Sequence, residues 1–380
     1  MTTPDRDELV ERAAAISGST DVGPSGWEEG LDRLLAAVDQ ARLQPRSQST
    51  VEAMLTGRLA RRQTIESWYR EHGDEVRPVE EITVVIGLPR TATTAMQHVL
   101  ALDPAFRFQR RWEISSPVPP PEIEAEAEDP RRLAAREAAG AATEPSVQHI
   151  SSVDGPVDDG MLLGLDFGNQ ELGLPVEPYT RWWRRADASS TYAYHRRVLG
   201  LLHHHRPPRR WLVKAPYHNF HLDELAEAYP NARFVMTHRD PALSFPSTCS
   251  TVLSARRDLL PDEETDPIRL AAFLLEHLTE GIGRAMAARR RIGDERFLDV
   301  SQHEVEHDPL GTVARIYLFL GAEPSPGTEE RIQAWAAENR RGARGTHRYA
   351  AEEHGLTSDA IREAFADYIQ TFAVPLESPR

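Results

Sequence analysis

Short apolar runs alternate with segments of helical periodicity along most of the chain, and this pattern predicts an α/β fold. The runs at residues 82–87, 211–215, 233–237 and 297–300 have the length and apolar character of strands that are buried on both faces. The segments between them carry apolar residues at helical spacing. We therefore expect a mostly parallel sheet that is flanked by helices.

Three other parts of the chain do not follow this alternation. Residues 1–80 carry two amphipathic stripes and are expected to form a helical appendage before an α/β domain over residues 81–350. Within that domain, about residues 115–208 are expected to form a helical insertion over the carboxyl ends of the strands, where open α/β sheets bind ligands. Residues 351–380 are expected to be a C-terminal helical segment. The insertion contains aromatic residues that either line a ligand site or, as is more common, pack in the core: Trp182, Trp183, Tyr192 and Tyr194.

Composition narrows the classes of function and of partner. At 380 residues and 40% hydrophobic content, the chain can bury one substantial core. Its formal net charge of −15 argues against general binding of nucleic acid or of anionic membranes. The single cysteine, Cys249, excludes an internal disulfide. The first residues lack the apolar core of a signal peptide, and no run has the length of a membrane span. We interpret the protein as cytoplasmic.

The first strand runs into a turn, residues 87–94 (GLPRTATT), that has the character of an anion-binding loop. Helical apolar spacing follows it, so backbone N–H groups and the positive end of a helix dipole are expected to point at one place. A Walker A loop would need Lys where Thr93 stands, whereas the cation here comes early, at Arg90. The dinucleotide fingerprint also fails, because Gly87 is the only glycine of the turn.

Three further segments carry cations at expected strand ends or in a glycine-rich stretch. Residues 211–218 (WLVKAPYH) end a strand at Lys214, and residues 233–247 place Arg239 after the next strand and Ser247 eight residues later. Residues 340–348 (RRGARGTHR) combine arginines with glycines near the C-terminus. Together with the loop, these segments predict two cationic pockets at neighbouring strand ends of one sheet.

This set and order of segments resembles the sulfotransferases that use 3′-phosphoadenylyl sulfate (PAPS), in particular the bacterial and carbohydrate-type branch with a G-x-P-R-x-x-T-T loop. The resemblance covers about residues 80–350 and implies a P-loop-like fold. It also implies PAPS as the donor, adenosine 3′,5′-bisphosphate (PAP) as the product, and no metal. Ala92 departs from the family's glycine and requires a backbone conformation that a Cβ tolerates. The residues that the resemblance assigns to the donor are Gly87, Pro89, Arg90, Thr91, Ala92, Thr93 and Thr94 at the 5′ end, and Arg239, Ser247, Arg341, Gly342 and Arg348 at the 3′-phosphate.

Transfer of a sulfuryl group to a hydroxyl is an in-line displacement that needs positioning, charge stabilisation and a proton acceptor. The resemblance assigns charge stabilisation to Arg90 and Lys214. The family's carbohydrate-type branch has a glutamate base shortly after the loop helix, a place that Glu113 fits, and its small-molecule branch has a histidine after the strand lysine, for which His218 is the nearest counterpart. We favour Glu113, with His218 or a further group as alternatives.

Other interpretations of the sequence stay open. A P-loop kinase is disfavoured by the missing lysine and by the second pocket, and an inactive nucleotide-binding interaction protein is kept open by Ala92 and the uncertain base. The sequence H-E-V-E-H at residues 303–307 matches a zinc-protease pattern, but the proline at 309 makes a continuous helix unfavourable, and we expect a loop. The expected partner is a small hydroxylated acceptor, apolar or aromatic in character. The sequence does not decide its identity or whether the chain forms a homodimer.

Overall fold

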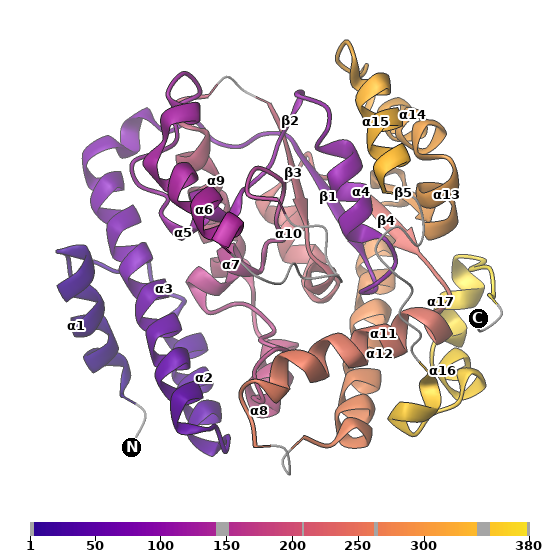
Figure 1. Ribbon diagram of the computed structural model, residues 1–380, viewed down its shortest axis with the longest axis horizontal. Helices are drawn as coiled ribbons and strands as arrows, with labels where there is room; N and C mark the ends of the chain where they lie inside the picture. The colour runs from indigo at the N-terminus through magenta and orange to yellow at the C-terminus, as the bar shows by residue number, and fades with distance from the viewer. Residues whose placement is uncertain (1–3, 142–151, 207–208, 262–264, 340–349, 378–380) are drawn as a thin grey trace.

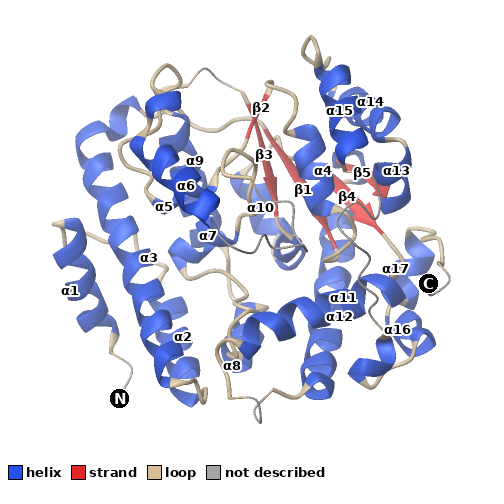
Figure 2. Cartoon of the chain, in the orientation of Figure 1, coloured by secondary structure: helices blue, strands red, loops and turns tan. Residues whose placement is uncertain are grey.

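The computed structural model describes residues 4–141, 152–206, 209–261, 265–339 and 350–377. Within these residues a five-stranded sheet has the order β2-β3-β1-β4-β5, and every neighbouring pair is parallel (Figures 1 and 2). The α/β prediction is confirmed, and the sequence missed only the two-residue edge strand. The strands are β1 (Ile82–Gly87), β2 (Phe106–Arg107), β3 (Arg210–Lys214), β4 (Arg233–His238) and β5 (Phe297–Ser301).

Both faces of the sheet are covered, which explains why the inner positions of its longer strands are mostly apolar. Side chains alternate along β1, so that Val84 and Ile86 pack in one core and Val85 in another. The first core is completed mainly by α9 (Ser189–His203), α10 (Leu222–Ala228), α11 (Pro241–Arg257) and α12 (Pro267–Ile292). The second is completed by α4 (Thr93–Leu100), α14 (Pro309–Leu320) and α15 (Thr328–Glu338).

The N-terminal helices pack side by side along one flank of the molecule (Figure 1). They share a core with residues 167–183 of the predicted insertion. Arg62 anchors them to this region, because its fully buried guanidinium donates to Asp166 at 2.8 Å and to the backbone oxygens of Val22 and Pro24. The helices are α1 (Arg6–Ser17), α2 (Glu28–Gln40) and α3 (Pro45–His72).

The described residues between β2 and β3 form helices and loops. Of the four aromatic residues singled out in this region, Trp183, Tyr192 and Tyr194 pack in the core and are at most 3% exposed, as the commoner of the two interpretations had it. Trp182 is only partly buried. The helices are α5 (Arg111–Ser115), α6 (Pro130–Ala141), α7 (Gly160–Leu163), α8 (Glu177–Trp183) and α9.

Two further parts of the fold border the carboxyl edge of the sheet. Residues 303–307, expected as a loop, lie on the short helix α13 (Gln302–His307), because Ser301 and Glu304 make a reciprocal capping box at its start. The C-terminal helices α16 (Ser358–Ala364) and α17 (Ala366–Thr371) pack beside α11 and α12 (Figure 2).

The turn between β1 and α4 has an unusual backbone. Gly87 adopts φ +138°, and a Cβ there would lie 2.5 Å from the carbonyl oxygen of Thr237. Arg90 and Ala92 adopt φ +67° and +72°, in the left-handed region that L-residues avoid. Asn219 supports the turn by donating to the carbonyl oxygen of Gly87 at 2.9 Å. The chain therefore tolerates a Cβ at Ala92 at the expense of local strain.

We expect Ala92→Gly to raise the free energy of unfolding by up to about 1 kcal/mol. Relief of the left-handed strain contributes about 1–2 kcal/mol and exceeds the entropic cost of glycine in the unfolded chain, about 0.4–1 kcal/mol. Ala134→Gly, at an exposed position of α6, is the matched control and should cost about 1 kcal/mol. Denaturant unfolding of both variants tests this, and equal destabilisation by both would contradict the strain.

Candidate active site

A cavity of about 560 Å³ lies at the carboxyl ends of the strands. Its size suits a nucleotide-like or drug-sized ligand. Residues from the ends of β1, β3 and β4 meet there because parallel strands end at the same edge of the sheet. The predicted site residues that line it are Pro89, Arg90, Ala92, Thr93, Thr94, Lys214 and Arg239.

The loop presents the start of α4 to this cavity. Ala92 is the N-cap residue and makes no side-chain cap hydrogen bond, so its side chain satisfies none of the N–H groups of the first turn. Thr93 and Thr94 open the helix and line the cavity. Exposed N–H groups, two hydroxyls and the helix dipole together make a site for an anion.

Thr91 has a different position from the other loop threonines. Its side chain is fully buried, and its hydroxyl donates to the carbonyl oxygen of Leu88 at 2.7 Å and lies 2.7 Å from the hydroxyl of Thr237. The Thr91 hydroxyl therefore maintains the shape of the turn. The whole residue is buried and does not line the cavity, so Thr91 acts on a ligand only through the shape of the turn.

The residues predicted for the two ends of the donor lie next to one another. Arg90 Nε donates to Ser247 Oγ at 3.1 Å, and Arg239 Nη1 donates to the carbonyl oxygen of Arg90 at 3.4 Å. Arg239 Nε also lies 3.4 Å from a carboxylate oxygen of Glu377. Arg341, Gly342 and Arg348, which were predicted to close over the same phosphate, lie outside the described residues.

Lys214 has two neighbours in the cavity that the sequence did not single out as a pair. Its Nζ lies 3.6 Å from Asp158 Oδ2, and the hydroxyl of Tyr217 donates to Asp158 Oδ1 at 2.8 Å. Both Asp158 and Tyr217 line the cavity. The signal for Asp158 was the turn-like sequence at residues 156–160 (PVDDG) inside the predicted insertion, but nothing in it indicates contact with Lys214.

His218, the second candidate base, lies in a buried network behind the cavity. Its Nε2 is 2.8 Å from Asp159 Oδ2, and its Nδ1 is 2.8 Å from the hydroxyl of Tyr192. Burial lowers the pKa of His218 despite the opposing charge of Asp159. The pKa of Asp159 is reduced to about 2: burial acts to raise it, but hydrogen bonds with His195 and His218 outweigh burial. Because both ring nitrogens of His218 are occupied by protein groups, neither is available to an acceptor in this structure.

Glu113, the favoured candidate base, is also fully buried and is not among the residues that line the cavity. Its Oε1 accepts from Arg107 at 2.7 Å and from Arg110 at 2.8 Å, and its Oε2 accepts from the backbone N–H of Arg110. Burial acts to raise the pKa of Glu113, but the two arginines lower it below its ordinary value. This geometry matches an ion pair at a helix end.

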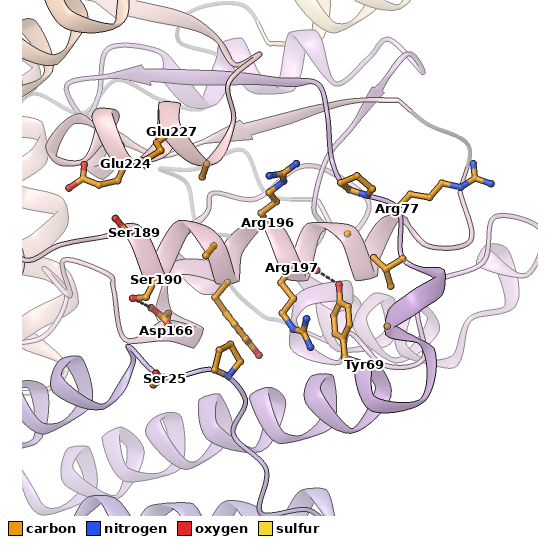
Figure 3. Close-up of a pocket in the computed structure, with 18 residues that line it drawn as sticks. Ser25, Tyr69, Arg77, Asp166, Ser189, Ser190, Arg196, Arg197, Glu224 and Glu227 are labelled. Carbon is orange, nitrogen blue, oxygen red and sulfur yellow. Dashed lines mark hydrogen bonds between the residues drawn. The ribbon is translucent and has the colours of Figure 1, made fainter.

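A second cavity, of about 620 Å³, lies between α3, α9 and α10 and contains none of the predicted site residues (Figure 3). Asp166, Glu224 and Glu227 line it together with arginines. One of these, Arg197, already forms an ion pair with Glu66 at 2.8 Å. A polyanionic donor is better matched by the first cavity, where a helix N-terminus adds to the cations.

The described residues show neither a metal site nor a membrane-spanning helix. Among them, no group of three or more His, Cys, Asp or Glu side chains is arranged to hold a metal ion. His303 and His307 stack with ring centroids 4.0 Å apart on α13. No described helix combines the length and the apolar character needed to cross a membrane.

Comparison with known proteins agrees with this geometry. The family model described as "Sulfotransferase family" matches residues 83–326, which is well over half of the chain. The crystal structure of sulfotransferase STF9 from Mycobacterium avium is 31% identical, with a TM-score of 0.91 over 100% of this chain and 98% of that one. Sulfotransferase STF1 from Mycobacterium tuberculosis is 27% identical, with a TM-score of 0.83 over 96% and 99%.

A curated relative gives a more distant match. The omega-hydroxy-beta-dihydromenaquinone-9 sulfotransferase Stf3 of Mycobacterium bovis is 21% identical over 163 residues, which span 41% of this chain and 40% of that protein. The assignment to a family rests on the family match and on the full-length structural similarity, and does not depend on this relative. The chain belongs to the sulfotransferase family.

Proposed function

We propose that the 560 Å³ cavity binds PAPS and transfers its sulfuryl group to a hydroxyl of a small apolar acceptor. One observation carries this proposal: Arg90, Lys214 and Arg239, from the ends of three adjacent strands, line a single cavity beside the N-terminus of α4. A donor with an anionic group at each end needs such a combination of cations and N–H groups.

The 5′-phosphosulfate is assigned to the turn, where Thr93, Thr94 and the first N–H groups of α4 hold it. Arg90 and Lys214 stabilise the charge that develops on the oxygen between phosphorus and sulfur as that bond breaks. The proposed 3′-phosphate position is at Arg239 and Ser247. The contact between Glu377 and Arg239 supports this assignment, because a carboxylate occupies the position that a phosphate oxygen would take on the guanidinium.

One part of the cavity wall, with Leu172, Val252 and Ala255, favours an apolar acceptor. Along α11, Thr248, Thr251, Val252 and Ala255 form one face at helical spacing, and Leu172 lies in the segment before α8. The name of the relative Stf3 refers to a hydroxylated menaquinone, and an apolar alcohol is the acceptor class proposed for this chain as well. A kinase would not require the Arg239 position, and an inactive binding module would not require Lys214 beside the turn.

We expect Arg239→Ala to weaken PAP binding at least tenfold, because charge-assisted hydrogen bonds to phosphate contribute about 1.5–3 kcal/mol each. Thermal shift with PAP and with ATP measures the effect, since a ligand of the folded state raises the melting temperature. Arg233→Ala removes an arginine from the opposite end of the same strand and is the matched control. Unchanged PAP affinity in Arg239→Ala, or stabilisation of the wild type by ATP alone, would contradict the assignment.

We expect Glu113→Gln to destabilise the protein by about 3–5 kcal/mol while leaving turnover per folded molecule unchanged. The substitution leaves the buried Arg107 without a carboxylate partner, whereas Arg110 keeps its ion pair with Glu126, and an unpaired buried charge is the costly result of breaking an ion pair from one side. Denaturant unfolding and turnover at saturating PAPS separate the two effects. A large loss of turnover at unchanged PAP affinity and stability would restore Glu113 as the base.

A further inference from the structure

Two of the described residues that line the 560 Å³ cavity carry carboxylates, Asp158 and Glu306. Of these, Asp158 is the one that contacts Lys214, with its Oδ2 3.6 Å from Nζ. Its side chain is 45% exposed, so an acceptor in the cavity can reach it. A carboxylate beside the charge-stabilising lysine is where a proton acceptor for the reaction is needed.

The two oxygens of Asp158 have different environments. Oδ1 accepts from the hydroxyl of Tyr217 at 2.8 Å and from the backbone N–H of Gly160 at 3.0 Å. Oδ2 accepts no hydrogen bond from any described residue, and the lysine Nζ at 3.6 Å is its charged neighbour. Burial raises the pKa of Tyr217 well above its ordinary value, so Tyr217 stays a neutral donor that fixes Oδ1. Oδ2 is therefore the oxygen with lone pairs available to an acceptor.

The residues after Asp158 hold it against the end of β3. The N–H of Asp159 donates to the carbonyl oxygen of Lys214 at 3.0 Å, and its buried carboxylate contacts His218 and His195. Gly160 leaves room for Tyr217, since a Cβ there would lie 2.5 Å from the tyrosine oxygen. The position of the Asp158 carboxylate is thus set by a network of buried groups, as a catalytic group requires.

We propose that Asp158 is the general base of the sulfuryl transfer, with Tyr217 as its positioning residue. The inference rests on the proposed function. As the acceptor oxygen forms its bond to sulfur, Asp158 Oδ2 takes the hydroxyl proton. The bond between sulfur and the bridging oxygen breaks, and its electron pair stays on the phosphate of PAP, next to Arg90 and Lys214. Atoms and charges balance without a metal or a further reactant.

The test compares two probe acceptors of different acidity, 1-decanol and 4-nitrophenol, with PAPS hydrolysis to PAP and sulfate as a readout that needs no added acceptor. At pH 8 most of the 4-nitrophenol is already ionised and needs no base. We expect Asp158→Asn to lower turnover of 1-decanol and of water about 100-fold or more and that of 4-nitrophenol much less. PAP affinity should stay the same or improve, because the substitution removes a negative charge beside an anion site.

Two control variants complete the design. Asp367→Asn, at an exposed position of α17 outside the cavity, should leave turnover unchanged, and Asp158→Glu should restore part of the lost turnover. Tyr217→Phe should lower the turnover number for 1-decanol more than it changes the Michaelis constant.

Equal losses for all acceptors, or no loss, in Asp158→Asn would overturn the proposal. A wild-type protein that PAP does not stabilise, or that transfers to none of the three acceptors, would instead contradict the proposed function.

Discussion

Parallel pairing of β3, β1 and β4 is the constraint on which the site depends. Parallel neighbours end at the same edge, so the turn after Gly87, the lysine at the end of β3 and the arginine after β4 face one space although they are far apart in sequence. If one of these strands ran in the opposite direction, its cation would lie at the other edge of the sheet. The fold thus concentrates positive charge locally in a chain whose net charge is −15.

Such a concentration of positive charge is unfavourable by itself. Nearby carboxylates and a hydroxyl dipole compensate for it. Asp158 lies beside Lys214, Glu377 lies beside Arg239, and Ser247 accepts from Arg90. These contacts are long or partly exposed, so they are weak. A polyanionic donor can replace the Glu377 contact with shorter, charge-assisted hydrogen bonds. The same cations are therefore held in place before the donor binds and remain available to it.

Elsewhere the protein uses strong buried ion pairs where it needs fixed positions. Arg62 with Asp166 joins the N-terminal helices to the segment after α7, and Glu113 with Arg107 and Arg110 fixes the start of α5. Each of these carboxylates is satisfied by several donors, which is what makes a charge tolerable in the interior. In these ion pairs the carboxylate is fully engaged by donors from the protein. In Asp158 only Oδ1 accepts hydrogen bonds from described residues, which is the property expected of the proposed base.

The sequence by itself determined the fold class and the four longer strands. It also determined which residues of the turn and of the strand ends line the cavity. Those signals are local: apolar runs of strand length, a cation at the strand end, and glycine where the chain must turn. The tertiary structure alone decided that Glu113 is enclosed by arginines, that Thr91 faces inward, and that Asp158 lies beside Lys214. These facts depend on contacts between residues that lie as far as 146 positions apart in the sequence, and no periodicity records which side chains meet there. Strand ends can be aligned from pattern because a sheet has a regular geometry, whereas the positions of the described helices and loops between β2 and β3 follow from packing.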